Sequence, residues 1–139
     1  NFFGKFESGA ILEGKVISKE TKYNITKIKI EEEVLILPGN FKKRGDLIKV
    51  RVRARDVLVS KKTFNLNFFE NTFVGKVDEI IAEKETAFAE VLIKIGKNKK
   101  HQFLRARITR YQLKKMNLKI SEKIYVHIKA VSFDRQAII

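Results

Sequence analysis

Apolar and polar residues alternate strictly along two separate segments of the chain. Residues 48–54 and residues 124–130 each place an apolar side chain at every second position. A period of two is that of a β-strand with one face in the core and one in water. In the second segment His127 falls on the polar side of the alternation, so we expect it to face outward. Residues 26–30 and 89–95 have a similar pattern and predict two further strands.

One helix is predicted, and it begins after Thr109. Gln112 follows three residues later, the spacing of a capping box. Leu113 and Met116 would give this helix a narrow apolar stripe. Elsewhere the pattern indicates strands and turns, and the triplet of glutamates at residues 31–33 falls in one of these turns. The predicted fold class is therefore all-β, with one short helix in the second half of the chain.

An internal repeat divides the chain. The letters GKV at residues 14–16 recur at residues 75–77, 61 positions later, and the alternating strand at 48–54 recurs at 124–130, 76 positions later. The second copy is therefore longer, and the predicted helix accounts for most of the extra residues.

We therefore expect two tandem small β-barrel modules, one over residues 1–66 and one over residues 67–139. A module of this size buries little surface by itself. The modules should pack against each other or against a second chain.

The repeat also bears on a motif that resembles a nucleotide site. Residues 9–15 spell G-x-x-x-x-G-K, as in a phosphate-binding loop, but Val16 stands where that loop needs Ser or Thr. The residues that follow predict a strand instead of the required helix, and the second copy has no first glycine. What both copies keep is a glycine early in a strand, which predicts a bend or bulge.

The net charge of the chain limits the classes of molecule that it is expected to bind. The chain has 30 Lys and Arg against 16 Asp and Glu, for a net charge of +14. Such a surplus favours a polyanion, an anionic membrane or a small oxyanion, although a lysine-rich and asparagine-rich composition also follows from an AT-rich coding sequence.

Several function classes lose support from the residue inventory. Cysteine is absent and histidine occurs twice, so no thiolate metal site exists and no zinc site is indicated. No apolar run reaches the roughly 18 residues of a membrane span. No catalytic arrangement of side chains is legible, so we expect no enzyme activity of this chain. Because it starts at Asn1 and its one methionine is Met116, we expect a piece of a longer polypeptide.

A nucleic-acid-binding barrel is the main alternative from another class. The basic side chains of residues 49–55 could follow a phosphate backbone, as they do in other small barrels. Stacking platforms would require aromatic side chains among them, whereas the phenylalanines cluster at the starts of the modules and near residues 64–73. This distribution favours packing between modules or chains.

Three stretches carry a resemblance to a known family. RARDV at residues 53–57, ARIT at residues 106–109 and IKAVS at residues 128–132 resemble the C-terminal regulatory domain of molybdate ABC transporter ATPase subunits. Residues 11–30 fit the pattern of the first half of that domain. The second half resembles the molybdate-binding module known as Mop or TOBE type.

The resemblance implies a duplicated OB-like fold and a regulatory and dimerisation role. It implies a homodimer, with molybdate or tungstate bound at the dimer interface for feedback control. It further implies an ATP-binding cassette with Mg-ATP in a missing N-terminal part, which contacts the membrane subunits of the transporter. The location would be cytoplasmic, at the inner face of the plasma membrane, with no nucleic acid as partner. Related domains serve other ions, so ferric iron or sulfate remains an alternative cargo.

The resemblance also implies site residues. Lys129 matches the lysine that contacts the oxyanion, with the Ala130 backbone and Ser132 beside it. Asn71 matches the last residue of the family's S-x-R-N segment, which forms the other wall.

Two positions of that segment differ from the family pattern. Phe68 replaces the serine and Glu70 replaces the arginine, and a carboxylate facing a dianion costs about 1 kcal/mol or more. In the first module Arg53 matches Lys129, and Asp56 stands where Ser132 does. We expect this first copy to bind an oxyanion poorly.

Overall fold

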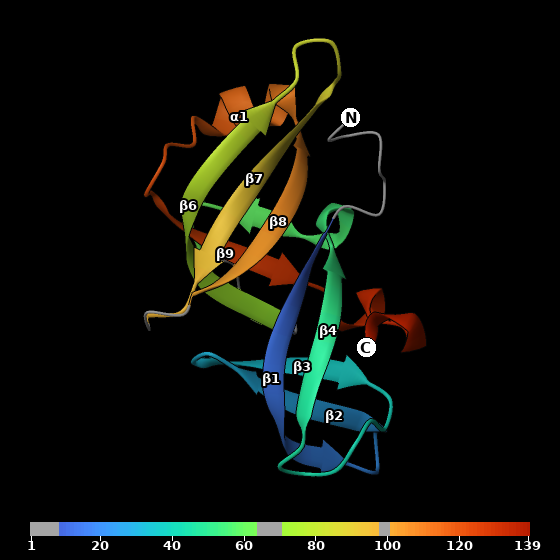
Figure 1. Cartoon of the computed structure of the whole chain (residues 1–139). Helices are drawn as coiled ribbons and strands as arrows, with labels where there is room; N and C mark the ends of the chain where they lie inside the picture. The colour runs from blue at the N-terminus through green and yellow to red at the C-terminus, as the bar shows by residue number, and fades with distance from the viewer. Residues whose placement is uncertain (1–8, 64–70, 98–100) are drawn as a thin grey trace.

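Two antiparallel sheets make up the molecule. The structure is a computed structural model that describes residues 9–63, 71–97 and 101–139. In the first sheet the strands lie in the order β3-β2-β1-β4, and in the second the order is β5-β9-β6-β7-β8. Figure 1 shows the second sheet, with its helix, above the first. The all-β prediction with two OB-like halves and one short helix is confirmed.

The strands and turns have the following bounds. The first half contains β1 (Gly9–Glu20), β2 (Ile25–Ile30), β3 (Glu33–Pro38), β4 (Leu47–Arg53), the 3₁₀ turn η1 (Ala54–Asp56) and β5 (Leu58–Ser60). The second half contains β6 (Asn71–Ala82), β7 (Phe88–Ile95), β8 (Gln102–Thr109), the helix α1 (Arg110–Met116), β9 (Lys123–Ile128) and the 3₁₀ turns η2 (Ala130–Ser132) and η3 (Arg135–Ala137).

The predicted alternation and the predicted helix cap are both present. Along β4 the apolar residues Ile48, Val50 and Val52 are buried, and the basic residues between them face solvent or are half-buried. The helix α1 begins after Thr109, whose hydroxyl accepts a hydrogen bond from the Gln112 amide at 2.9 Å. Its two apolar side chains pack against the core, as the stripe predicted.

The two halves repeat each other in detail. Gly14 and Gly75 occupy equivalent places in β1 and β6, and each strand has a bulge just beyond its glycine. A side chain at either glycine would overlap the neighbouring strand, because a Cβ would lie 2.6 Å from the Lys29 carbonyl oxygen or 2.8 Å from that of Lys94. The motif therefore marks the bulge that the repeat predicted, together with a close approach of strands, and a strand instead of a helix follows it.

Each half also gives its last segment to the other sheet. Strand β5 belongs to the first half of the sequence, yet it pairs with β9, placing Val59 opposite Val126. In return Ile138 forms a bridge with Val50 of β4, and the Ile139 amide donates to the Lys49 carbonyl at 3.0 Å. The predicted boundary between residues 66 and 67 lies outside the described residues. The sheets themselves are joined by this exchange.

Two side-chain amides fasten the sheets together. Asn71 of β6 accepts a hydrogen bond from the Ile36 amide of β3 at 2.7 Å and donates to the Ile36 carbonyl at 3.1 Å. Gln102 of β8 forms the same pair of bonds with Glu13 of β1, at 2.8 and 3.0 Å. The buried apolar residues of both sheets form one continuous core. In the described part of the chain, no helix is long and apolar enough to cross a membrane.

Candidate anion-binding site

The corner after β9 carries three of the four residues expected to bind an oxyanion. Lys129 has extended backbone angles (φ −69°, ψ 137°) and leads into the turn η2. The Ser132 amide donates to the Lys129 carbonyl at 2.9 Å, and the Phe133 amide donates to the Ala130 carbonyl at 3.0 Å. Ala130 and Phe133 are buried, so the core fixes the position of this corner.

Lys129 presents its positive charge to solvent at this corner. Its side chain is exposed, and among the described residues no salt bridge involves it. An ammonium group held at the edge of a fixed turn can bind an anion without first leaving a carboxylate partner.

Asn71 lies beside this corner, but its side chain has a structural task. Strand pairing places Asn71 opposite Ile128, the residue before Lys129. The Asn71 side chain is fully buried, and it uses its oxygen and one N–H on Ile36. One N–H of the amide is left for any other acceptor.

Ser132 lines a cavity that the sequence did not reveal. The cavity has a volume of about 190 Å³, and residues of both repeats line it, among them Arg51, Arg53, Asp56 and Asp134. The two repeat corners, η1 and η2, therefore contribute to one hollow. The repeat offset of 76 residues shows that Asp56 and Ser132 are equivalent positions. It does not show that the two corners line the same cavity.

The first copy of the corner is already neutralised. Arg53 matches Lys129 in the repeat, and its Nε donates to the Asp56 carboxylate at 2.9 Å. Both side chains are partly buried, at 35% and 21% exposure. A dianion at this corner would have to compete with Asp56 for the guanidinium.

The expectation that His127 faces outward is wrong. Its side chain is 2% exposed and lies between two hydroxyls, with Ser60 Oγ 3.0 Å from Nε2 and Thr72 Oγ1 3.1 Å from Nδ1. Alternation along β9 does place His127 on the opposite face from Val126 and Ile128, and there the side chains of Ser60 on β5 and Thr72 on β6 flank its ring. Burial lowers the pKa of His127 below its usual value.

The two departures from the family pattern, Phe68 and Glu70, lie outside the described residues. Within the described ranges, no group of three or more histidine, aspartate or glutamate side chains is arranged to hold a metal ion.

Comparison with known proteins finds a family match in the second half of the chain and relatives over most of its length. Residues 69–133 match the TOBE domain model. The chain is 23% identical over 127 residues to the molybdenum import ATP-binding protein ModC of Photobacterium profundum, and 28% identical over 130 residues to the ModC protein of Yersinia pestis. These alignments cover 91% and 94% of this chain but 34% of each relative, so the chain spans about a third of their length.

A solved structure shows the same fold. The crystal structure of the cytoplasmic molybdate-binding protein ModG, with molybdate bound, superposes with a TM-score of 0.74 at 19% identity. The match covers 93% of this chain and 92% of that one. The likeness to that structure shows the fold of this chain, and residues 69–133 match the TOBE domain model.

Proposed function

We propose that this TOBE-domain chain is the regulatory domain of an import ATPase subunit, and that it binds molybdate, tungstate or a similar tetrahedral dianion at the Lys129 corner. The similarity to molybdenum import ATP-binding proteins supports the class of ligand. The role is binding and regulation. ATP hydrolysis with Mg-ATP would belong to the part of the subunit that the matched relatives have beyond this region.

The observation that carries the proposal is the contrast between the two repeat corners. At the first corner the Arg53 guanidinium is paired with Asp56 at 2.9 Å. At the second, a serine stands in place of that aspartate, and Lys129 is exposed without a salt bridge in the described part of the chain. A dianion needs a cation together with hydroxyl or N–H donors, and the second corner supplies both.

A second copy of the chain would complete the site. Lys129 is exposed, so one corner covers only part of an anion, and the remaining donors would come from a partner across a homodimer interface. An anion that bridges two copies favours the arrangement in which both contact it. In the full subunit this preference would link anion binding to ATPase activity and to the membrane subunits, at the cytoplasmic face of the membrane.

Calorimetric titration of the chain with molybdate, tungstate and sulfate tests the proposal. Replacing Lys129 with glutamine should weaken molybdate binding about tenfold or more, the loss expected for one hydrogen bond to a charged group. Replacing the exposed Lys114 of α1 with glutamine is the matched control and should leave the affinity unchanged.

Equal affinity of the Lys129→Gln variant for molybdate would place the anion elsewhere. Heat from sulfate but not from molybdate would retain the regulatory domain and change the cargo. Tight binding of a single-stranded oligonucleotide with a steep salt dependence would instead favour the nucleic-acid alternative.

A further inference from the structure

Three lysines lie side by side across three adjacent strands of the second sheet. Lys76 of β6 is the direct partner of Lys94 on β7 and of Lys123 on β9. We call Lys94, Lys76 and Lys123 the lysine row. Lys123 begins strand β9, and Lys129 follows the end of the same strand. The strand pattern gives polar positions along each strand, but it does not give their lateral register.

The lysine row costs the fold stability, because like charges directly opposite each other on paired strands repel. The two outer lysines of the row have contacts that offset part of this repulsion. Lys94 lies 3.7 Å from Asp78, and Lys123 lies over the Tyr125 ring at 5.5 Å. The central Lys76 is exposed, and within the described residues it takes part in no salt bridge or ring contact. Binding of an anion would relieve the repulsion among these three lysines.

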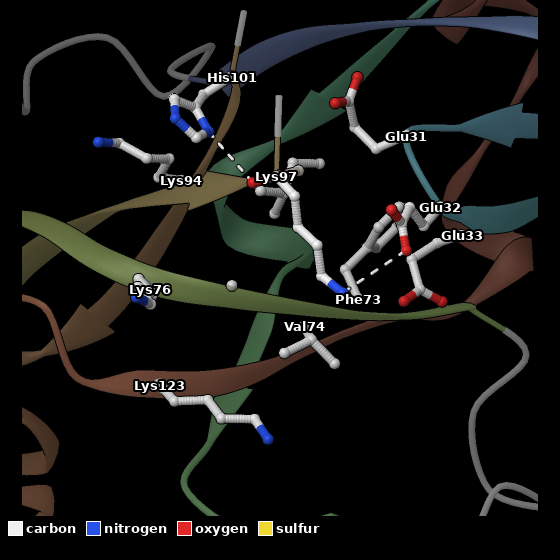
Figure 2. A pocket seen from close by; sticks show the side chains of 13 residues that line it. Glu31, Glu32, Glu33, Phe73, Val74, Lys76, Lys94, Lys97, His101 and Lys123 are labelled. Carbon is white, nitrogen blue, oxygen red and sulfur yellow. Dashed lines mark hydrogen bonds and ion pairs between the residues drawn. The ribbon is translucent and has the colours of Figure 1, made fainter. Parts of the chain in front are cut away.

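The row lines a hollow with a volume of about 720 Å³. This is within the usual range of small-molecule sites. Figure 2 shows the three lysines on one side of the hollow and Glu31, Glu32 and Glu33 on the other.

The acidic side has partners of its own. Glu31 accepts a hydrogen bond from Gln102 at 2.8 Å, and Glu32 lies 3.8 Å from Lys97. Within the described residues no salt bridge joins the lysine row to these three carboxylates, so its positive charge remains available to a ligand. The acidic side would limit how far an anion extends into the hollow.

We propose that the lysine row binds a small ligand that carries two or more linked phosphate groups. Adjacent strands are about 4.8 Å apart, so the row spans about 10 Å from Lys94 to Lys123. A single tetrahedral dianion carries two negative charges for three lysines, whereas a chain of linked phosphates places negative charge along the whole row. Inorganic polyphosphate and the phosphate chain of a nucleotide share this chemistry.

The first half of the molecule contains an incomplete copy of the row. Lys15 of β1 is paired with Lys29 on β2, as Lys76 is with Lys94, but its partner on β4 is Leu47. Leu47 is 76% exposed and lines a similar hollow of about 620 Å³. The chain therefore provides an internal comparison, a row of the same strand register with one lysine fewer, in a hollow that Lys42 and Lys49 also line.

Calorimetric titration with inorganic tripolyphosphate at low salt tests the proposal. One site per chain is expected. The Lys76→Gln variant should bind about tenfold more weakly, and the equivalent Lys15→Gln variant should bind as the unaltered chain does. In the absence of ligand, Lys76→Gln should also melt at a slightly higher temperature, which shows that it is folded and that repulsion has been relieved.

A second variant tests the geometry by gain of function. Leu47→Lys completes the row in the first half, so the number of tripolyphosphate sites should rise from one to two, while Leu47→Gln should leave it at one. Tighter binding of ATP than of tripolyphosphate would point to a nucleotide, and the reverse order would point to the inorganic chain.

Three results would overturn the proposal. The first is equal tripolyphosphate affinity in the unaltered chain and in Lys76→Gln. The second is sulfate binding as tight as tripolyphosphate binding, since a single oxyanion would then suffice. The third is a Leu47→Lys variant that folds but gains no site.

Discussion

Asn71 and Lys129 are neighbours across a pair of strands, and the fold assigns them different tasks. The Asn71 amide is buried and spans from β6 to β3, whereas the Lys129 ammonium is exposed at the end of β9. The resemblance to known domains indicated both positions as binding residues. It could not separate them, because the partner of Asn71, Ile36, lies 35 residues away and belongs to the other sheet.

Replacing Asn71 with alanine should lower the free energy of unfolding by about 2–3 kcal/mol, because the amide and carbonyl of Ile36 would lose their partners at a partly buried site. Chemical denaturation measures this loss. The matched control is Gln102→Ala, which removes the corresponding bonds to Glu13 at an exposed place and should cost less. Equal losses in the two variants would contradict the structural role of Asn71.

His127 makes the stability of the chain depend on pH. Burial lowers its pKa in the folded state, so between that pKa and the ordinary value of about 6.5 the unfolded chain binds a proton that the folded chain does not. The free energy of unfolding should therefore fall as the pH drops below about 6.5, by at most about 1.4 kcal/mol per pH unit from this group.

Denaturation at pH 7.5 and pH 5.5 measures this effect. The difference between the two values should shrink in His127→Gln and persist in His101→Gln, which removes the other histidine of the chain. An unchanged difference in His127→Gln would show that other groups cause the pH dependence.

At the scale of elements, local patterns predicted the strands and the helix well. The alternation along β4 and the Thr109–Gln112 cap depend on neighbours within a few residues, so the sequence contains them. The three-residue strand β5 is too short to show a period, and its partner β9 is more than 60 residues away. Ser60 of that strand contacts His127 on the face that alternation alone assigns to solvent, and this contact could not be predicted from the local pattern.

The two repeat glycines make the clearest prediction for an element. Gly14→Ala and Gly75→Ala should each destabilise the fold by about 1–3 kcal/mol, because a Cβ would lie 2.5 or 2.6 Å from an isoleucine methyl group on the next strand. Thermal and chemical denaturation measure the loss, and Ser18→Ala on β1 serves as a control that should be nearly neutral. Unchanged stability in both glycine variants would contradict the close approach of the strands.

At the scale of the whole molecule, the exchange of segments makes the two halves one folding unit. β5 completes the second sheet, Ile138 contacts the first, and the buried residues of both form one core. The sequence repeat predicted two similar modules, but it could not show that each module uses a segment of the other.

This arrangement predicts a single unfolding transition. Val59 of β5 is 7% exposed, and Val59→Ala should destabilise the fold by about 1–2 kcal/mol. Hydrogen exchange should show that protection falls to the same extent in β1–β4 and in β6–β9. Loss of protection confined to the second sheet, or two separate calorimetric transitions, would contradict the shared folding unit.

The central claim is that a tetrahedral dianion binds at the Lys129–Ser132 corner. Tungstate has the geometry of molybdate and a strong anomalous X-ray signal, so crystals of this chain grown with tungstate locate the anion directly. We predict an anomalous peak within hydrogen-bond distance of Lys129 Nζ and Ser132 Oγ, with a second copy of the chain beside it. A peak confined to the lysine row, or one in the cavity beside Arg53 and Asp56 that is out of reach of Lys129 Nζ, would contradict this assignment.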